Sequence, residues 1–343
     1  MNFFKCPKCE RRWQYPIRLC PHCLVDLEKS KSEKMTVVAS SKAMIPTIMH
    51  PAVPYFAHII EDENNNKYAY KTVKEYKIGE EIKYEPVDDK DAVAIWRIKY
   101  DISDAIKSTL QLLKIDFAEN SKILILPTLV SPNHAYFREN TSPDFLAGVL
   151  QFLFEKKIKP ENIKIAAQSF DETPIEASAQ KSGLLDVCMK NNIAPLDIAK
   201  TNFVKQGNLE ISEEITKADI VLNLSILKIG QAASTENIFK VLKKENYLAS
   251  KYLYSETEIA NELMGNLANT ITIGEAEVIQ RPDKLTVFMG LTLAGKNYLN
   301  LDRIFNEISM AKAMPKIIEE IRPENIKTVG REIKEVQYNI NVC

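Results

Sequence analysis

The spacing of apolar residues changes character partway along the chain. In the first part, short apolar-rich runs alternate with turn residues, and an Asn-rich turn at 63–67 separates two of the runs. Such runs are typical of β-strands, and the turn is typical of a hairpin. The predicted strands lie at 35–39, 55–60, 68–73 and 81–84. Several short strands so close together predict a small β-barrel.

From residue 92 onwards the pattern alternates between strands and helices. Apolar residues recur at helical spacing over 101–113, and Ser142-Pro143-Asp144 combines an N-cap, a proline at the first helical position and an early acid. Residues 173–176 have the form of a capping box. Apolar runs predict strands at 94–98, 123–126, 163–167, 220–227 and 285–289. This alternation predicts an α/β domain with a largely parallel sheet.

The chain has 343 residues, which is long for one core and indicates two or three domains. A charged segment at 28–34 and an acidic segment at 87–91 are the expected hinge and linker. We therefore predict a multidomain protein. Its expected parts are a small ribbon at 1–30, a β-barrel at 31–88 and the α/β domain at 92–343.

Two C-x-x-C pairs stand in the first part. Cys6, Cys9, Cys20 and Cys23 are the ligand set of one tetrahedral zinc ion, because each short loop presents two sulfurs to the same point. A site closed by four protein ligands is structural rather than catalytic. Residues 1–30 are too few for a hydrophobic core, so the metal is expected to supply much of their folding energy.

Composition excludes several classes of function. The formal net charge is −1, which argues against general attraction to nucleic acid or anionic lipid. No apolar run reaches the roughly 20 residues that a membrane span needs, and the N-terminus leaves no room for a signal peptide. The remaining cysteines, Cys188 and Cys343, are isolated. A disulfide framework is therefore not expected, and the expected location is the cytoplasm.

The first part of the chain shows a family resemblance. The four-cysteine ribbon has a tryptophan and a proline between its pairs, and it is followed by Val-Pro-Tyr-Phe-Ala at 53–57 and Lys-Ile-Gly-Glu-Glu-Ile at 77–82. Over about 3–86 this order resembles the domain-of-unknown-function family 35. The resemblance implies a rubredoxin-like zinc ribbon, an OB-fold barrel and association with acyl-CoA enzymes, so the implied partner is a thiolase-like enzyme.

The second part resembles another family. Trp96-Arg97, the Thr-Ser-Pro at 141–143 and the segment 217–228 with its Ala-Asp, strand Asn and final Lys resemble the domain-of-unknown-function family 362 over roughly 92–335. Two departures stand out: Leu-Pro-Thr at 126–128 where the family often has Lys-Pro-Asn, and Lys-Ile-Gly at 228–230 where it often has Lys-Thr-His. These two departures argue against a metal or anion site built from the His of Lys-Thr-His and the Lys of Lys-Pro-Asn.

Ligands of open α/β sheets bind beyond the carboxyl ends of the strands. The expected loops are 131–140, 168–172 and 228–235. In the third loop, Lys228 and free N–H groups at a helix start near Ser234 could hold an anion; the alternative is a capped helix with a solvated lysine. If the loops converge, His134 joins an acid–base group with members of the substrate-binding set. That predicted set is Arg138, Asp171, Glu172, Asn223 and Lys228.

Three functional hypotheses follow. The favoured one is an adaptor whose ribbon and barrel dock onto an acyl-CoA enzyme. The second is an enzyme acting on a small anionic or acyl substrate in the α/β crevice, and whether the chain is catalytic stays open. The third is a single-stranded nucleic-acid binder with a stacking surface, against which the near-zero net charge stands. The aromatic residues of that surface would be Tyr55, Phe56, Tyr68, Tyr70 and Tyr76.

Overall fold

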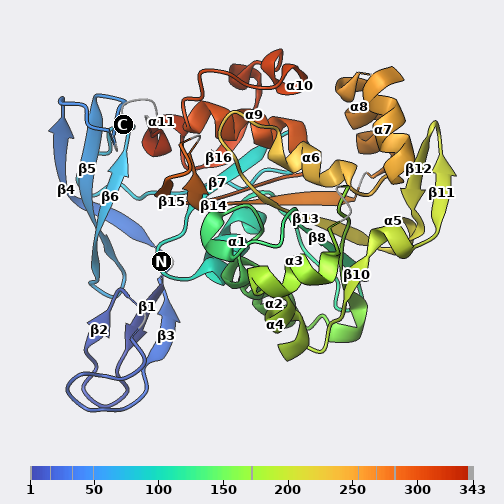
Figure 1. The fold of residues 1–343 in the computed structure, drawn as a ribbon. Coiled ribbons are helices and arrows are strands. Elements are labelled where there is room, and N and C mark those ends of the chain that lie inside the picture. Colours follow the sequence, from blue (N-terminus) through green and yellow to red (C-terminus); the bar gives the residue numbers. More distant parts are fainter. Residues whose placement is uncertain are drawn as a thin grey trace. The chain divides into compact units, whose positions relative to one another are not determined.

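The computed structural model describes residues 2–338 apart from positions 16, 33, 49, 171–172, 254, 268 and 282. The chain divides into two compact units (Figure 1). The first comprises Met1–Glu85 with Lys334–Gln337, and the second Pro86–Ile333 with Tyr338–Cys343. The division falls beside the expected linker at 87–91, whereas the finer boundary between ribbon and barrel stays a prediction. The return of a C-terminal segment to the first unit has no signal in the local sequence.

The first unit consists of two small antiparallel sheets. One has the order β2-β1-β3 and the other the order β4-β5-β6. Their strands are β1 (Asn2–Lys5), β2 (Arg12–Trp13), β3 (Glu28–Lys31), β4 (Met35–Ala43), β5 (Tyr55–Asp62) and β6 (Lys67–Thr72). Segment 79–82 pairs with β4 around a bridge between Thr36 and Glu81. Small strands are thus confirmed, but a closed OB-fold barrel is not confirmed by the pairings of the described residues.

The hairpin between β5 and β6 is built around Asp62. Its Oδ1 accepts the backbone N–H groups of Asn64 (2.9 Å) and Asn66 (2.8 Å), and its Oδ2 accepts the Tyr68 hydroxyl at 3.1 Å. Burial would raise the pKa of this carboxyl, but the hydrogen bonds from Ser32 and Asn66 outweigh burial and lower the pKa. The Asn-rich turn expected from the sequence is therefore held by an ionised aspartate.

Alternate residues of β5 and β6 point into the core of the first unit. Tyr68 and Tyr70 are buried there with Val37, Ile60 and Ile82. Phe56 is also buried. Bases cannot stack on rings enclosed by protein, so these three aromatics do not form the open stacking surface that the third hypothesis requires.

The second unit is organised by a mixed sheet. In the part of the chain that the structure describes, it has eight strands in the order β10-β9-β8-β13-β14-β15-β7-β16. The pairs β14–β15 and β15–β7 are antiparallel, and the other five pairs are parallel. The strands are β7 (Val93–Arg97), β8 (Ile123–Pro127), β9 (Ile163–Ala167), β10 (Pro195–Asp197), β13 (Ile220–Ile226), β14 (Thr270–Gln280), β15 (Thr286–Gly295) and β16 (Thr328–Gly330). A separate hairpin joins β11 (Phe203–Gln206) and β12 (Leu209–Ser212).

Helices cover both faces of the large sheet. Figure 1 shows α1 and α2 on one face and α6 and α9 on the other. The main helices are α1 (Ile102–Leu112), α2 (Pro143–Glu155), α3 (Ile175–Ser182), α4 (Leu184–Lys190), α6 (Ala233–Phe239), α7 (Lys244–Leu253), α8 (Glu256–Asn266) and α9 (Tyr298–Ile308). Shorter ones are α5 (Glu213–Lys217), α10 (Lys316–Glu319) and α11 (Ile333–Val336), with 3-10 turns at Ala135–Phe137, Pro160–Asn162, Ile198–Lys200 and Pro323–Asn325. None of the described helices combines the length and apolar character needed to cross a bilayer.

Of the two helix N-termini predicted from capping residues, one is confirmed and the other is wrong. The Ser142 hydroxyl accepts the Phe145 N–H at 3.2 Å and caps α2, as its sequence predicts. The capping box expected at 173–176 is wrong, because α3 begins after Pro174 without a side-chain cap. A capping box works only where the Ser or Thr stands directly before the first turn, and here Pro174 holds that position.

Buried amides lock α6 onto the centre of the sheet. The Asn223 Nδ2 group on β13 donates to the Ser234 carbonyl (3.0 Å) and to the Thr272 hydroxyl (3.2 Å) on β14. Its Oδ1 accepts from the Nδ2 group of Asn237 at 2.8 Å, and Asn237 also donates to the Leu126 carbonyl on β8 at 2.9 Å. Direct hydrogen bonds of two side-chain amides thereby join three strands and one helix.

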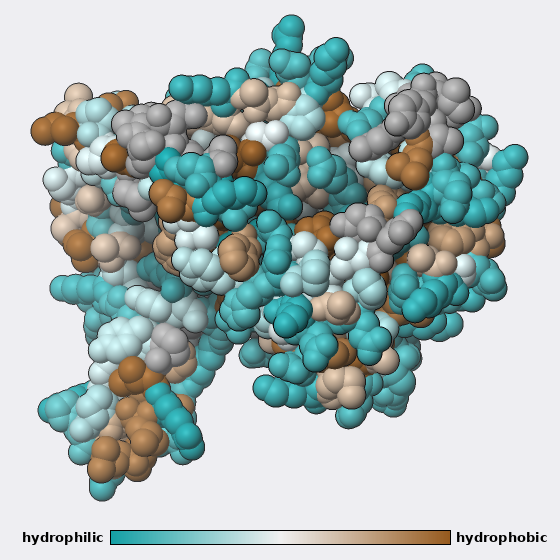
Figure 2. Space-filling model, in the orientation of Figure 1, coloured by the Kyte–Doolittle hydropathy of each residue, from teal (hydrophilic) through white to brown (hydrophobic). Residues whose placement is uncertain are grey.

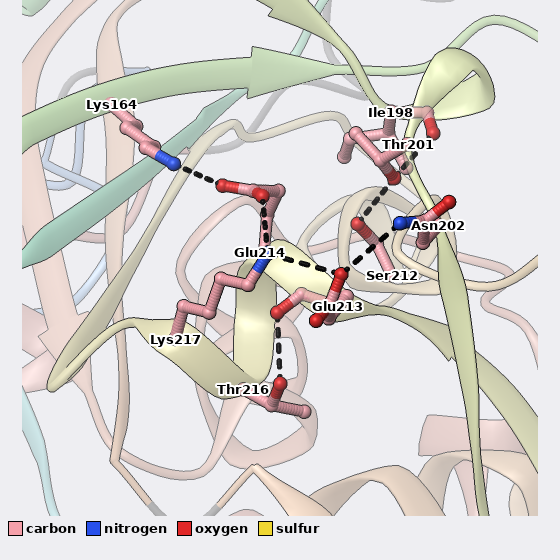
Figure 3. Close-up of polar contacts among 9 residues, drawn as sticks. All are labelled: Lys164, Ile198, Thr201, Asn202, Ser212, Glu213, Glu214, Thr216 and Lys217. Atoms are coloured by element: carbon pink, nitrogen blue, oxygen red, sulfur yellow. Dashed lines mark hydrogen bonds and ion pairs between the residues drawn. The ribbon is translucent and has the colours of Figure 1, made fainter.

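Ion pairs at the surface tie α5 to the sheet (Figure 3). Lys164 on β9 donates to the Glu214 carboxylate, and Lys217 lies 3.0 Å from Glu213 Oε2 and 3.3 Å from Glu214 Oε1. The Lys164 hydrogen bond lowers the pKa of Glu214. Solvent screens ion pairs at the surface, so these pairs orient a short helix rather than stabilise the domain.

We expect Asn223→Ala to lower the free energy of unfolding by about 1–3 kcal/mol, because it leaves the Ser234 carbonyl and the Thr272 hydroxyl buried without this donor. Urea unfolding followed by circular dichroism measures the change. The matched control is Asn202→Ala, whose exposed side chain makes one hydrogen bond of 3.4 Å to Glu213 and should change stability by less than about 0.5 kcal/mol. Equal losses in the two variants would contradict a central role for Asn223.

Candidate functional site

The four cysteines of the first unit come together as one cluster. The sulfur atoms of Cys6, Cys9, Cys20 and Cys23 all lie within 4.8 Å of one another, and the Cys9 and Cys20 sulfurs are 3.7 Å apart. A tetrahedral metal with bonds of about 2.3 Å to sulfur separates its ligands by about 3.8 Å. The cluster therefore could bind a metal ion with few changes in side-chain position.

The two cysteine loops have the same backbone structure. The N–H of Glu10 donates to the Cys6 carbonyl, and the N–H of Leu24 donates to the Cys20 carbonyl, both at 2.9 Å. Glu10 and Leu24 both adopt a left-handed conformation, with φ of 58° and 53°. The Cys9 N–H also points at the Cys6 sulfur, 3.4 Å away. The repeated loop explains why each C-x-x-C pair presents two sulfurs in one direction.

The thiols influence one another's ionisation. Burial would raise the pKa of Cys6, but N–H groups of Cys9 and Lys8 and neighbouring thiols outweigh burial and lower the pKa to about 7. Hydrogen bonding with Cys9, together with burial, raises the pKa of Cys23 to about 12. The protein alone thus favours one thiolate and opposes another. A bound cation removes this conflict, because it stabilises all four thiolates together.

The ribbon around the cluster exposes apolar side chains. Leu24 is 74% exposed, Tyr15 is 49% exposed and Leu19 is 43% exposed. Figure 2 shows hydrophobic residues gathered on this end of the first unit. Exposed apolar side chains grouped on one small element mark a surface available for contact with another molecule.

A second candidate site lies at the carboxyl ends of β8 and β13. From β8 the chain continues through α2 to β9, whereas from β13 it continues through α6 on the opposite face (Figure 1). Two neighbouring parallel strands whose connections leave to opposite faces form the crevice in which open α/β sheets bind ligands. The loops that border this crevice are residues 128–142 and 227–232.

The loop after β8 is rigidly braced. Asn140 is buried, and it accepts the Val130 N–H at 2.8 Å and donates to the Ser131 carbonyl at 2.9 Å. The Glu139 carboxylate accepts from the Ser131 hydroxyl and the Asn133 amide, each at 2.7 Å. The Ser131 hydrogen bond lowers the pKa of Glu139, so this carboxylate stays ionised. Such bracing holds the intervening residues in fixed positions.

Arg138 in this loop faces a buried carboxyl that the sequence analysis did not find. Its Nη1 lies 3.6 Å from Oε1 of Glu275, which is completely buried on β14. The Ser142 N–H donates to Glu275 Oε2 at 2.9 Å. Burial raises the pKa of Glu275 to about 7 although Ser142 and Arg138 oppose it. The sequence has one signal of this site, the glutamates Glu275 and Glu277 within the apolar run 271–279, but the sequence analysis predicts no strand there.

The other predicted substrate-binding residues are dispersed. Asp171 and Glu172 lie outside the described residues. Asn223 is buried in the core network, where its amide is fully used. Lys228 is half-buried in the loop after β13, and burial lowers its pKa, an effect that Glu236 and Glu139 oppose.

The N-terminus of α6 does not offer free N–H groups, contrary to the anion-site hypothesis for the third loop. The Ser234 and Thr235 N–H groups donate to the Asp302 carboxylate, each at 2.9 Å, and the Thr235 hydroxyl donates to it at 2.8 Å. A carboxylate from α9 therefore occupies the place of an anion. The helix is capped, as the alternative expected, but Lys228 is half-buried rather than solvated. Burial raises the pKa of Asp302 to about 7, although these donors oppose the rise.

His134 also has a local role. Its Nδ1 accepts the Tyr136 N–H at 3.1 Å and caps the 3-10 turn at Ala135–Phe137. The ring is exposed. The acid–base group that would join it to Asp171 and Glu172 stays a prediction, because those two residues are outside the described part of the chain.

Comparison with known proteins leaves the family open. The sequence matches no family model, and no curated protein matches it. Among the solved structures that match is a chain described as "Ltp2-ChsH2(DUF35) aldolase", with 21% sequence identity and a TM-score of 0.21. The match covers 25% of this chain and 73% of that chain. A TM-score this low does not establish a shared fold.

We expect the protein to bind one divalent metal per chain through the four thiols. Titration with Co²⁺ should produce the absorption bands of a tetrahedral thiolate complex, and Cys23→Ser should weaken binding by more than about 100-fold, because it removes a direct ligand. Binding should also weaken as the pH falls, since protons compete for the thiolates.

The control for this titration is Cys188→Ala. The Cys188 thiol is buried inside the second unit, and burial raises its pKa to about 11, so its removal should leave the spectrum unchanged. Retention of the wild-type spectrum and affinity by Cys23→Ser would exclude a four-thiolate site.

Proposed function

We propose that Cys6, Cys9, Cys20 and Cys23 hold a structural zinc ion and that the first unit is an adaptor that docks onto an acyl-CoA enzyme of the thiolase type. The observation that supports this most directly is the sulfur cluster in a ribbon that also exposes apolar side chains. Four thiolates fill every position of a tetrahedral ion, so no position is left for a substrate. The metal would then shape the ribbon, and the ribbon would make the contact.

The conformation of Leu24 supports a contact role. With φ of 53°, this position favours glycine, since a side chain there costs about 1 kcal/mol. Leu24 gains little from burial, because 74% of it is exposed. A large apolar side chain that is neither buried nor conformationally favoured is best explained by contact with a partner.

The class of partner rests on the resemblance of residues 3–86 to the domain-of-unknown-function family 35, whose members associate with thiolases and related acyl-CoA enzymes. The second unit, which resembles family 362, would accompany this adaptor as a ligand-binding α/β domain. Free thiols in a metal cluster suit the reducing cytoplasm. A role in binding single-stranded nucleic acid is not favoured, because Phe56, Tyr68 and Tyr70 are buried.

The docking proposal predicts a direct complex with a thiolase encoded in the same genome. Mixing the two purified proteins should give a complex on size-exclusion chromatography with light scattering. The double variant Leu19→Ser/Leu24→Ser should bind at least about 10-fold more weakly, as expected for the loss of apolar contact residues. Removing the metal with a chelator should also abolish the complex.

The matched control is Ile78→Ser, which removes another exposed apolar side chain of the first unit, 72% exposed, outside the ribbon. It should bind as the wild type does. The Co²⁺ spectrum of the double variant shows whether its metal site is intact. Absence of any complex with the wild-type protein, or equal affinity of the double variant with an intact metal site, would refute the proposal.

A further inference from the structure

We propose that the crevice beside Arg138 binds an oxyanion group, a carboxylate or a phosphate, and that Glu275 behind the arginine takes up a proton when the anion binds. This site belongs to the second unit and is independent of the docking function of the ribbon. Arg138 is the residue that contacts the ligand, and Glu275 is a positioning residue that acts through Arg138.

Arg138 has donors without sufficient acceptors. Its Nε is buried and has no hydrogen-bond partner, and the 3.6 Å separation between its Nη1 and Glu275 Oε1 is too long for a hydrogen bond. Its side chain is nevertheless 20% exposed, so a small ligand can reach it. The planar guanidinium fork matches the paired oxygens of a carboxylate or phosphate group. An oxyanion would therefore pair with the exposed part of the side chain, and the enclosed Nε–H would respond to it indirectly.

The position of Arg138 is fixed before a ligand arrives. It adopts a left-handed backbone conformation, with φ of 55°, next to the braced residues Glu139 and Asn140. A non-glycine residue in this conformation is strained, and the surrounding hydrogen bonds maintain it. Strain held by a rigid loop is common where a side chain must be presented to a ligand.

Glu275 is the unusual partner in this arrangement. It is 0% exposed, and among the described residues its Oε1 has no hydrogen-bond partner, while Oε2 accepts the Ser142 N–H alone. A buried carboxylate oxygen without a donor is unfavourable, and protonation relieves the cost. Oε1, the oxygen nearest Arg138, is thus the place where a proton would be held.

The charges facing Glu275 set the direction of the linkage. Arg138 faces it from the loop and Glu277 from its own strand, and Arg138 also interacts with Glu277. Ser142 contributes an N–H from the start of α2, and Asp144 interacts with Glu277. The paired positions on β13 and β15, Ile226 and Thr292, are uncharged. An anion bound to Arg138 neutralises the cation that faces Glu275 and adds a negative charge nearby. Both changes raise the pKa of Glu275 above its value of about 7.

Binding of the anion is therefore accompanied by uptake of a proton, and it weakens as the pH rises.

A second cation borders the same crevice. Lys228 follows β13 and interacts electrostatically with Glu139, the neighbour of Arg138, as well as with Glu236 and Lys284. Burial lowers its pKa, and an anion nearby would oppose that decrease. Lys228 and Arg138 thus lie on the loops of adjacent strands, and the carboxylates of Glu139 and Glu277 partly offset their positive charge.

The test uses the full chain labelled with ¹⁵N-arginine, with acetate and sulfate as probes. Neither anion changes its charge between about pH 6 and 8.5. Each probe should shift the Nε–H resonance of Arg138, which is assigned from its loss in Arg138→Lys. Tighter binding of acetate identifies a carboxylate site, and tighter binding of sulfate identifies a site for a tetrahedral group such as phosphate. Arg322→Lys, at an exposed position, is the control and should leave both affinities unchanged.

The proton linkage has its own readout. The dissociation constant of the wild-type protein should increase as the pH rises from 6.5 to 8.5, by up to about tenfold for each unit that the anion adds to the pKa of Glu275. Glu275→Gln should still bind but lose this pH dependence. If that variant does not fold, the pH profile of Lys228→Gln decides, because deprotonation of Lys228 would give the same trend as Glu275 and is removed in this variant. No shift of the Arg138 resonance would overturn the anion site, and a flat wild-type profile would overturn the proton uptake.

Discussion

The hydrogen bonds of Asn223 and Asn237 in the centre of the large sheet are the interaction on which the second unit depends. They join β8, β13 and β14 to α6 through amides that are completely enclosed. The network fixes β8 and β13 relative to each other, so it also fixes where the loops that follow these two strands begin. If one of these two amides were lost, its hydrogen-bond partners would stay buried and unpaired, because water cannot reach them. This cost is why such networks specify one arrangement.

Two buried carboxyl groups of the second unit, Asp302 and Glu275, differ in function because they differ in the number of hydrogen bonds that they receive. Asp302 receives three hydrogen bonds from Ser234 and Thr235 and closes the N-terminus of α6. Glu275 is equally buried but receives one N–H and faces Arg138 at 3.6 Å. Burial raises the pKa of each to about 7. The fully bonded carboxyl is a structural cap, whereas the poorly bonded one keeps a capacity to respond to a ligand.

The first unit is stabilised differently. Its ribbon has few buried apolar side chains, among them Phe3, and its cysteine loops carry left-handed residues that cost conformational energy. Bonds from four thiolates to a metal would compensate for both deficits. The same arrangement leaves Leu19 and Leu24 available at the surface, so metal binding and partner contact would be properties of one small element.

Local patterns in the sequence determined the cluster of four cysteines, the cap of α2 and most parallel strands, because each depends on residues close together along the chain. The positions of β14 and α9, the antiparallel half of the sheet and the pairing of Arg138 with Glu275 depend on contacts between distant segments. The anion-like cap of α6 likewise comes from Asp302, far along the chain. Spacing indicates which face a side chain occupies, but only the tertiary structure determines which distant group meets it there.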